Sequence, residues 1–400
     1  MTRHPHRGIP RSVWALGLVS LCMDFSSEMI HSLLPVYLVT ALGASALTVG
    51  FIEGIAEATA NITKVFSGTL SDWLGRRKLL TVIGYGLATV TKPVFALATS
   101  IGPVVGARFI DRIGKGIRGA PRDALIADIT PGHLRGASFG LRQALDTVGA
   151  FLGPLVAIGL MMVTANAFRT VFWIATIPAI IAMVLLVWGV QEPERSTAPS
   201  GKQTPRLAEL GRMNRAYWMV VLVATVLTMA RFSEAFLVLR AQDVGLRLAL
   251  IPLVLVVMNV VYAAVAYPAG ALADRFGRRG MLVVGMVCLL IADLVLALGD
   301  TILTTFLGIG FWGIHMGFTQ GVFAALVADT APATLRGSAF GVFNLATGLA
   351  MLGASILAGA LWEGYGPGAT FLAGAAFTCL ALIGVTAIQP TPAAAVPSAP

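Results

Sequence analysis

Long apolar runs separated by short polar connections fill almost the whole chain. A run of about 20 apolar residues is long enough to cross a bilayer as a helix. Lipid offers no partner to backbone N–H and C=O groups, which favours helices, and the short alternating segments of a membrane barrel are missing from this sequence. The pattern therefore predicts an all-α membrane protein with twelve transmembrane helices, at residues 14–40, 46–70, 79–98, 101–121, 137–163, 168–190, 214–239, 247–270, 280–299, 302–326, 337–361 and 368–388.

Composition and charge agree with this pattern. Hydrophobic residues make up 57% of the 400 positions and charged residues 12%, whereas soluble domains carry about 25% charged residues. Of the 28 Lys and Arg, 19 precede the first predicted helix, lie in the even-numbered connections or stand near the helix ends beside them, and three lie in or beside the connections on the other side. This bias follows the positive-inside rule. We therefore expect both termini in the cytoplasm, an inner-membrane location, a lipid bilayer as partner and no nucleic acid.

The chain contains two similar halves on either side of a polar stretch at 191–213. GTLSDWLGRR at 68–77 matches GALADRFGRR at 270–279, and DITPGHLRG at 128–136 matches DTAPATLRG at 329–337. The first pair is offset by 202 residues and the second by 201, which indicates duplication and a substrate path where the halves meet. The expected parts are an N-terminal six-helix half at 1–190, a cytoplasmic linker at 191–213, a C-terminal six-helix half at 214–390 and a disordered tail at 391–400.

These repeated loops resemble those of the major facilitator superfamily. The resemblance covers nearly the whole chain and implies the twelve-helix fold of that family, alternating access and a monomer. An Asp at a helix end can pair with an Arg of a neighbouring helix and latch one conformation. We also expect the loop arginines Arg135 and Arg336 to join the two halves when the cytoplasmic side closes. The residues assigned to this conformational latch are Gly68, Asp72, Gly75, Arg76, Arg77, Asp128, Arg135, Asp274, Arg278, Arg279, Asp329 and Arg336.

Two further stretches resemble family motifs with departures. RFIDRIGKG at 108–116 is similar to the Arg-bearing motif of the fourth helix, although Asp111 and Arg112 replace the usual Gln-Gly. GAFLGP at 149–154 is similar to the motif of drug/proton antiporters but lacks its trailing glycine pair. Close helix packing through small residues is the other interpretation of this stretch. The residues concerned are Gly149, Gly153 and Pro154.

Ionisable side chains at membrane depth are costly, so each is a functional candidate. The first predicted helix carries Asp24, Glu28 and His31, whose spacings of four and three place them on one face. The family resemblance places this helix at the central cavity. Two carboxylates beside an imidazole suit the exchange of a proton. We expect proton coupling or substrate binding here, and a buried group that stiffens the bundle is the alternative.

Other helices supply further cavity candidates. Arg231 stands in the seventh helix where Asp24 stands in the first, which predicts that the two interact in at least one conformation. Arg108 is expected to influence proton affinity or an anionic solute. Lys92 is expected to neutralise a glutamate of the second helix. The remaining candidates are Glu234, His315 and Gln320.

The sequence lacks the recognisable motifs of enzymes and pumps. It contains no Walker loop, no zinc-protease helix and no nucleophile elbow, and its three cysteines fit no metal site. We therefore expect a protein that is not an enzyme and holds no cofactor or metal. The leading interpretation is a secondary transporter for a small-molecule substrate, coupled to protons and exporting small amphipathic compounds. The alternatives are proton-coupled uptake of an anionic metabolite or chelate and, from another class, a membrane receptor or enzyme.

Overall fold

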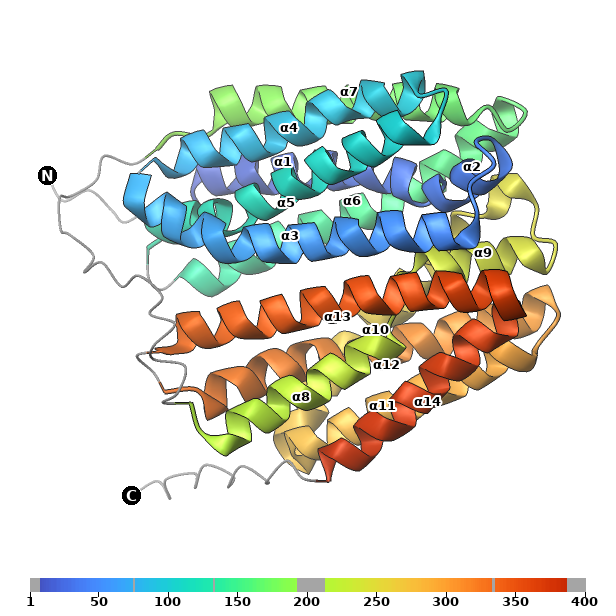
Figure 1. Ribbon diagram of the computed structural model, residues 1–400. Coiled ribbons are helices and arrows are strands. Elements are labelled where there is room, and N and C mark those ends of the chain that lie inside the picture. Colours follow the sequence, from blue (N-terminus) through green and yellow to red (C-terminus); the bar gives the residue numbers. More distant parts are fainter. Residues whose placement is uncertain (1–7, 75, 132–133, 193–212, 333–334, 387–400) are drawn as a thin grey trace, which may run out of the picture. The chain divides into compact units, whose positions relative to one another are not determined.

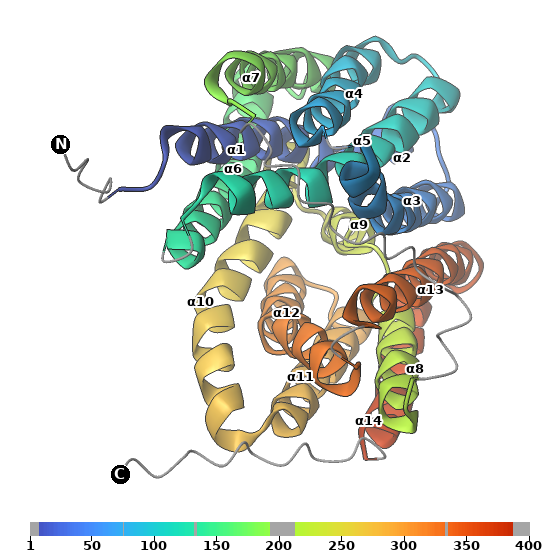
Figure 2. The same ribbon diagram turned by 90° about the vertical axis from the view of Figure 1, so that its left-hand side faces the viewer.

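A computed structural model describes residues 8–74, 76–131, 134–192, 213–332 and 335–386. These residues form helices joined by short connections, without a strand among them (Figure 1, Figure 2). The predicted tail at 391–400, and all but the ends of the predicted linker at 191–213, lie outside the described residues. The chain divides into two compact units, of which unit 1 comprises Met1–Thr204 and Ser233–Val256, and unit 2 comprises Pro205–Phe232 and Val257–Pro400.

Unit 1 is built from the first seven helices and a short segment from the middle of the chain. Its elements are α1 (Arg11–His31), α2 (Leu34–Thr40), α3 (Ala46–Leu74), α4 (Arg77–Leu97), α5 (Ile101–Ile129), α6 (Arg135–Val163), α7 (Phe168–Gly189), α9 (Ala235–Asp243) and the 3₁₀ turn η3 (Leu248–Leu250).

Unit 2 holds the remaining helices. Its elements are α8 (Arg215–Ala230), most of α10 (Leu253–Phe276), α11 (Arg278–Leu298), α12 (Ile302–Thr330), α13 (Arg336–Tyr365) and α14 (Pro367–Val385).

Ten helical segments among the described residues are long and apolar enough to cross a membrane. The two further long helices of unit 1, α3 and α5, have 29 residues each but carry many charges. Helix α5 alone contains four arginines, one lysine and three aspartates. Helices α3 and α5 are therefore long enough to span a membrane, and they differ from the ten other segments only in their charge. Together with these two helices, the ten segments form the predicted twelve-helix arrangement.

Both units repeat one packing pattern. In unit 1, α1 packs along α6 and α7, α5 along α3 and α4, and α4 along α7. In unit 2, α8 packs along α13 and α14, and α11 along α12 and α14 (Figure 1). The duplication seen in the loop motifs therefore extends to the helix contacts.

Glycines at equivalent positions allow these close approaches. A Cβ at Gly84 would lie 2.7 Å from the Gly114 carbonyl oxygen, and one at Gly285 would lie 2.6 Å from Thr319 Cγ2. Gly116 of α5 likewise approaches α3, and Gly317 of α12 approaches α10. The two pairs share an offset of 201 residues, the same as that of the second loop motif. Any side chain at these positions would push the helices apart.

The helix predicted at 14–40 is broken after His31. Pro35 is the second residue of α2. A proline has no N–H to donate, and its ring clashes with the carbonyl four residues earlier, which here belongs to His31. The sequence prediction missed this break because the apolar pattern continues through it. His31 consequently lies in the last turn of α1.

The helix predicted at 214–239 is also broken, between Ala230 and Ala235. The hydroxyl of Ser233 accepts a hydrogen bond of 3.2 Å from the backbone N–H of Ala235. Serine side chains that bond the local backbone compete with the helical hydrogen bonds. The break separates Arg231, which caps α8, from Glu234, which precedes α9.

The close approach of α5 to α3 predicts that Gly116→Ala destabilises the protein. The new Cβ would lie 2.5 Å from Thr63 Cβ and 2.9 Å from the Ala60 carbonyl oxygen. Overpacking of this kind costs about 1–3 kcal/mol. Thermal unfolding in detergent should therefore occur at lower temperature. Gly119→Ala on the same helix is the control, because its Cβ would meet no atom within 4 Å; equal destabilisation by both variants would contradict the interpretation.

Candidate transport site

The charged face of α5 organises unit 1. Arg108, Arg112 and Lys115 follow each other at spacings of four and three, so they share one face of the helix, with Asp111 beside them. The exposed apolar residues Phe109 and Ile110 lie on the other side of α5. The sequence thus separates a charged face from a lipid-type face within one helix.

One group of charges joins α5 to three other helices. Arg108 Nη2 lies 2.5 Å from Glu53 Oε2 on α3, and both side chains are almost completely buried. Arg112 Nη1 lies 3.2 Å from Oε1 of Glu57, one turn further along α3. We call this group the four-helix cluster; its members are Glu28, His31, Glu53, Glu57, Lys92, Arg108, Asp111 and Arg112.

Lys92 of α4 is fully buried in this cluster. Its Nζ lies 3.0 Å from Oδ1 of Asp111 and donates a hydrogen bond of 3.0 Å to the Ser27 hydroxyl. The expectation that Lys92 neutralises a glutamate of α3 is therefore wrong. The two glutamates of α3 pair with Arg108 and Arg112 of α5 instead, and Lys92 pairs with Asp111.

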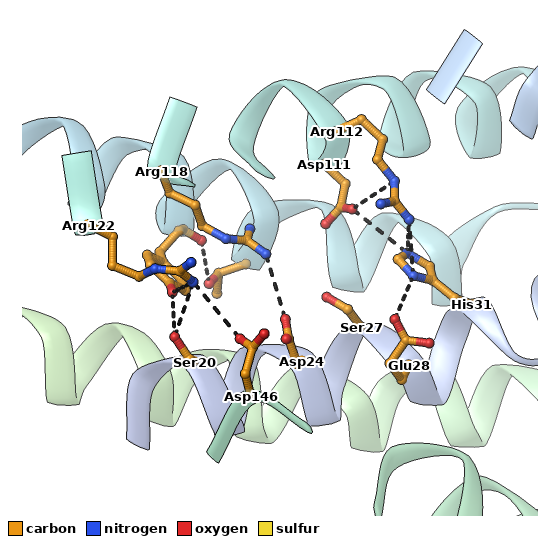
Figure 3. Close-up of polar contacts among 12 residues, drawn as sticks. Ser20, Asp24, Ser27, Glu28, His31, Asp111, Arg112, Arg118, Arg122 and Asp146 are labelled. Atoms are coloured by element: carbon orange, nitrogen blue, oxygen red, sulfur yellow. Dashed lines mark hydrogen bonds and ion pairs between the residues drawn. The ribbon is translucent and has the colours of Figure 1, made fainter. Parts of the chain in front are cut away.

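His31 lies at the meeting point of α1 and α5 (Figure 3). Nη2 of Arg112 is 3.2 Å from its Nδ1 and 3.3 Å from its Nε2. Its Nδ1 is 3.5 Å from Glu28 Oε1, and its Nε2 is 3.8 Å from Asp111 Oδ2. The predicted one-face arrangement of Glu28 and His31 on the first helix is thus present, and both residues face charges of α5.

Asp24 belongs to a second group, one turn of α1 away from Glu28. Its carboxyl lies beside the Asp146 carboxyl of α6 and interacts with it electrostatically (Figure 3), and its Oδ1 is 4.0 Å from Arg118 Nη2. Asp146 in turn faces Arg142 at 3.6 Å and Arg122 at 3.9 Å. We call Asp24 and Asp146 the carboxyl pair.

Hydrogen bonds and a cation–π contact fix the arginines around the carboxyl pair. Arg122 Nη1 donates to the Ser20 hydroxyl at 3.2 Å and to the Tyr85 hydroxyl at 3.4 Å. The Arg118 guanidinium lies 4.7 Å from the centre of the Tyr85 ring. Such contacts hold the guanidinium groups in place without neutralising them. Arg122 divides its charge between Asp146 and Asp123, whose Oδ1 lies 3.1 Å from its Nε.

Three acids of this site are more exposed than the two arginines of the four-helix cluster, whereas Glu53 and Asp111 are buried like those arginines. The side chains of Asp24, Glu28 and Glu57 are 27%, 25% and 34% exposed, whereas those of Arg108 and Arg112 are at most 4% exposed. The surface that the site offers to a solute is therefore mainly acidic.

Lys115 is the exception to this rule. It is exposed on the charged face of α5 and acts electrostatically on Asp24, Glu28 and Glu57. It makes no ion pair within 4.0 Å with any described residue. From the sequence, Lys115 is interpreted as structural and not as a cavity candidate, although its spacing of three and seven from Arg112 and Arg108 places it on the same face.

The other predicted cavity residues lie apart from these groups along the chain. His315 on α12 is fully buried, and its Nδ1 lies 2.9 Å from the Gly285 carbonyl oxygen. Gln320 is exposed on α12. Arg231 and Glu234 flank the break between α8 and α9. The described residues contain no group of three His, Cys, Asp or Glu that could hold a metal ion.

The repeated loop motifs form the same ion pair in each unit. Arg77 pairs with Asp128 in unit 1, and Arg278 pairs with Asp329 in unit 2. Arg77 Nη1 also donates a hydrogen bond of 2.8 Å to the Ala124 carbonyl. Each pair joins the start of one helix to the end of the next. Gly75 and the side chains of the predicted latch residues Asp72, Asp274 and Arg336 lie outside what the structure describes, and Gly68 lies within α3.

Two glycines of the antiporter-like stretch lie against α1. A Cβ at Gly149 would clash with the carbonyl oxygen of Leu21, and one at Gly153 would lie 2.7 Å from the carbonyl oxygen of Phe25. These contacts bring α6 directly against the part of α1 that carries Asp24. The approach explains how Asp146 reaches Asp24.

Known proteins share both the sequence and the fold. The profile of the Major Facilitator Superfamily matches residues 16–239 and 220–400. An uncharacterised MFS-type transporter of Methanocaldococcus jannaschii is 32% identical over 375 residues, which is 92% of each chain. The chain is a member of the major facilitator superfamily. It is therefore a multi-pass membrane transporter of a small solute.

Two further similarities concern parts of the sequence or the fold alone. The quinolone resistance protein NorA of Staphylococcus aureus is 30% identical over 201 residues, half of each chain. The crystal structure of the nucleoside transporter NupG superimposes with a TM-score of 0.74 at 14% identity, over 95% of this chain and 99% of that one. A D-xylose–proton symporter superimposes with a TM-score of 0.73 at 19% identity, over 94% and 97%.

The buried pair between α3 and α5 predicts a large effect of Glu53→Ala on stability. Removing the glutamate leaves the Arg108 guanidinium buried without its partner at 2.5 Å. Breaking a buried pair in this way costs about 3–5 kcal/mol. Thermal unfolding in detergent should show this loss, and Arg108→Ala in the same chain should recover part of it.

Glu57→Ala is the matched control for this prediction. Glu57 is one-third exposed, and Arg112 keeps Asp111 within 4.0 Å. Partly exposed pairs contribute about 1 kcal/mol or less, so the control should unfold close to the wild-type temperature. A larger loss for Glu57→Ala than for Glu53→Ala would contradict the order derived from burial.

Proposed function

We propose that this transporter is a proton-coupled exporter of small amphipathic compounds, with a preference for those that carry positive charge. The observation that carries the proposal is the carboxyl pair of α1 and α6. Two neighbouring carboxylates repel each other, so the pair favours holding one proton. Arg118 and Arg122 limit this repulsion without removing it.

The carboxyl pair offers a direct route to coupling. A cationic group that approaches Asp24 neutralises the same negative charge as the proton does. Proton and solute therefore compete for one site, and binding of either releases the other. Alternating access of such a site exchanges a proton on one side of the membrane for a solute on the other.

Exposure supports the preference for positive charge. The side chains of Asp24, Glu28 and Glu57 reach solvent, and the arginines that balance them lie beneath. A cation can contact these oxygens without desolvating an arginine. Similarity to a quinolone resistance protein over half the chain supports the direction of export. The contact of Gly149 and Gly153 with α1 supports an antiporter-type role for that stretch.

The remaining features of the transporter follow the charge bias of the loops and the repeats. We infer an inner-membrane location with cytoplasmic termini, because most of the Lys and Arg in the connections fall on one side. We also infer a single chain as the working unit. The pairs Arg77–Asp128 and Arg278–Asp329 support a role of the repeated loops in holding one conformation. The interaction of Asp24 with Arg231 stays a prediction.

Uptake of an anionic metabolite or chelate is the second candidate, and one observation favours it. The exposed ammonium of Lys115, which has no ion pair among the described residues, is suited to a carboxylate or phosphate group. The arginines expected to form an anion site are instead engaged: Arg108 with Glu53, and Arg112 with Glu57. This candidate therefore depends on Lys115.

Loss of the carboxyl pair should abolish coupling. In liposomes that contain the purified protein, a transported cation should drive proton movement, and Asp24→Asn or Asp146→Asn should reduce this flux to that of empty liposomes. The amide keeps the shape of the carboxyl but cannot exchange a proton. A pH-sensitive dye inside the liposomes measures the flux.

Asp123→Asn is the matched control. Asp123 also faces Arg122, at 3.1 Å, but its side chain is 43% exposed and lies outside the carboxyl pair. Its flux should match that of the wild type. Solute transport without any proton flux in the wild type would sink the proton-coupling proposal.

Lys115→Gln separates the two candidate functions. If solutes bind through their positive charge, removal of this ammonium should strengthen cation transport, because a repulsive charge near Asp24 and Glu28 is lost. If anions are the substrates, the same variant should lose transport. A screen of matched cationic, neutral and anionic solutes in liposomes measures the change; loss of anion transport would establish the second candidate in place of the first.

A further inference from the structure

Asp293 is a fully buried acid in the C-terminal half of α11. Its side chain is 0% exposed, and neither carboxyl oxygen has a hydrogen-bond partner among the described residues. Buried polar groups are nearly always hydrogen-bonded, so such an exception calls for a physical reason. Neither the carboxyl pair nor the four-helix cluster of unit 1 involves this residue.

The helices packed against α11 offer Asp293 no counter-charge. Helix α14 contains no charged residue, and its only thiol, Cys379, is exposed. Helix α12 contains His315, which bonds the Gly285 carbonyl two turns away along α11, and Asp329, which pairs with Arg278. The basic residues of α11 itself stand at its first turn.

The repeat places Lys92 at the equivalent position of unit 1. Helices α4 and α11 correspond at an offset of 201 residues, which aligns Lys92 with Asp293. In unit 1 the Lys92 ammonium is neutralised by Asp111 of α5. The residue at that place in α12 is Trp312, whose ring packs 5.6 Å from that of Phe232. Unit 2 therefore has an aromatic side chain, Trp312, at the position where unit 1 has Asp111, the ion-pair partner of Lys92.

Gly374 of α14 closes the site. A Cβ at this position would lie 2.8 Å from Oδ2 of Asp293 and 3.1 Å from Oδ1. The glycine thus lets α14 cover both carboxyl oxygens directly. An ionised carboxylate in such surroundings is far too costly to bury, and the group binds a proton instead.

We propose that Asp293 is a proton-binding site of unit 2, loaded while α14 covers it and able to exchange its proton when α11 and α14 separate. The site belongs to unit 2, shares no residue with the carboxyl pair of unit 1 and does not depend on the proposed export function. Its ligand is a proton, because α14 covers both carboxyl oxygens at Gly374 and neither oxygen has a hydrogen-bond partner among the described residues.

Infrared spectroscopy of the full-length protein in lipid tests the loaded state. At about pH 7, where exposed carboxyls are ionised, the wild type should show the carbonyl stretch of a protonated acid free of hydrogen bonds, and Asp293→Asn should lack that band. Asp24→Asn should keep it, which separates this proposal from the coupling at α1. Absence of the band in the wild type would overturn the proposal.

Proton exchange is tested by Gly374→Ala. The added methyl group forces α14 away from Asp293, so the band should weaken and the acid should exchange or ionise. Gly310→Ala on α12 is the control, because its Cβ would meet no atom within 4 Å.

A second measurement needs no variant that might alter folding. The O–H group of a protonated carboxyl adds across one C=N bond of an apolar carbodiimide. The proton moves to nitrogen, and the acid oxygen bonds to the central carbon. Mass spectrometry of the wild-type peptide should show Asp293 modified only under solute turnover, when the α11–α14 contact opens. Two results together would overturn the proposal that Asp293 exchanges its proton: an infrared band that persists in Gly374→Ala, and no carbodiimide modification of Asp293 during turnover. The proton of Asp293 would then be a fixed structural one.

Discussion

The need to pair charges inside a membrane shapes unit 1. Helix α5 cannot lie in lipid with its arginines exposed, because an unpaired ion at that depth is costly. Its charged face is therefore enclosed by α1, α3 and α4, which supply Glu28, Glu53, Glu57 and Lys92. Because of the same charges, α3 and α5 are less apolar than the ten other segments that are long enough to cross a membrane. Ion pairs between α3 and α5 therefore contribute more to their place in the membrane than contact with lipid does.

Unit 2 shows that the packing does not require the charges. The positions equivalent to Arg108, Asp111 and Arg112 are Ile309, Trp312 and Gly313. The glycine contacts of the helices nevertheless recur, as at Gly116 and Gly317. After duplication, small residues preserved the helix approach while the side chains facing the site diverged. Polar chemistry is thereby concentrated in unit 1, and Asp293 is isolated in unit 2.

The sequence predicts the helices, the repeat and the family well, because apolar runs and duplicated loops are local signals. It also places Asp24, Glu28 and His31 on one face. It does not predict which helix that face meets, so the contact between Asp24 and Asp146, and that between Lys92 and Asp111, had to come from the structure. The break after His31 could have been found from Pro35, whose effect on the preceding turn is local.

The helix contact and the acid chemistry at α1 are parts of one arrangement. Gly149 and Gly153 lie against the carbonyls of Leu21 and Phe25, which flank Asp24. Helix α6 carries Asp146 one turn before this contact. Any sliding of α6 along α1 therefore changes the separation of the two carboxyls, and with it the repulsion that favours a shared proton. Small residues at this contact make such sliding possible, since bulky side chains would interlock. The stretch at 149–154 has two interpretations, close helix packing and similarity to the motif of drug/proton antiporters. Both interpretations concern the same contact between α6 and α1.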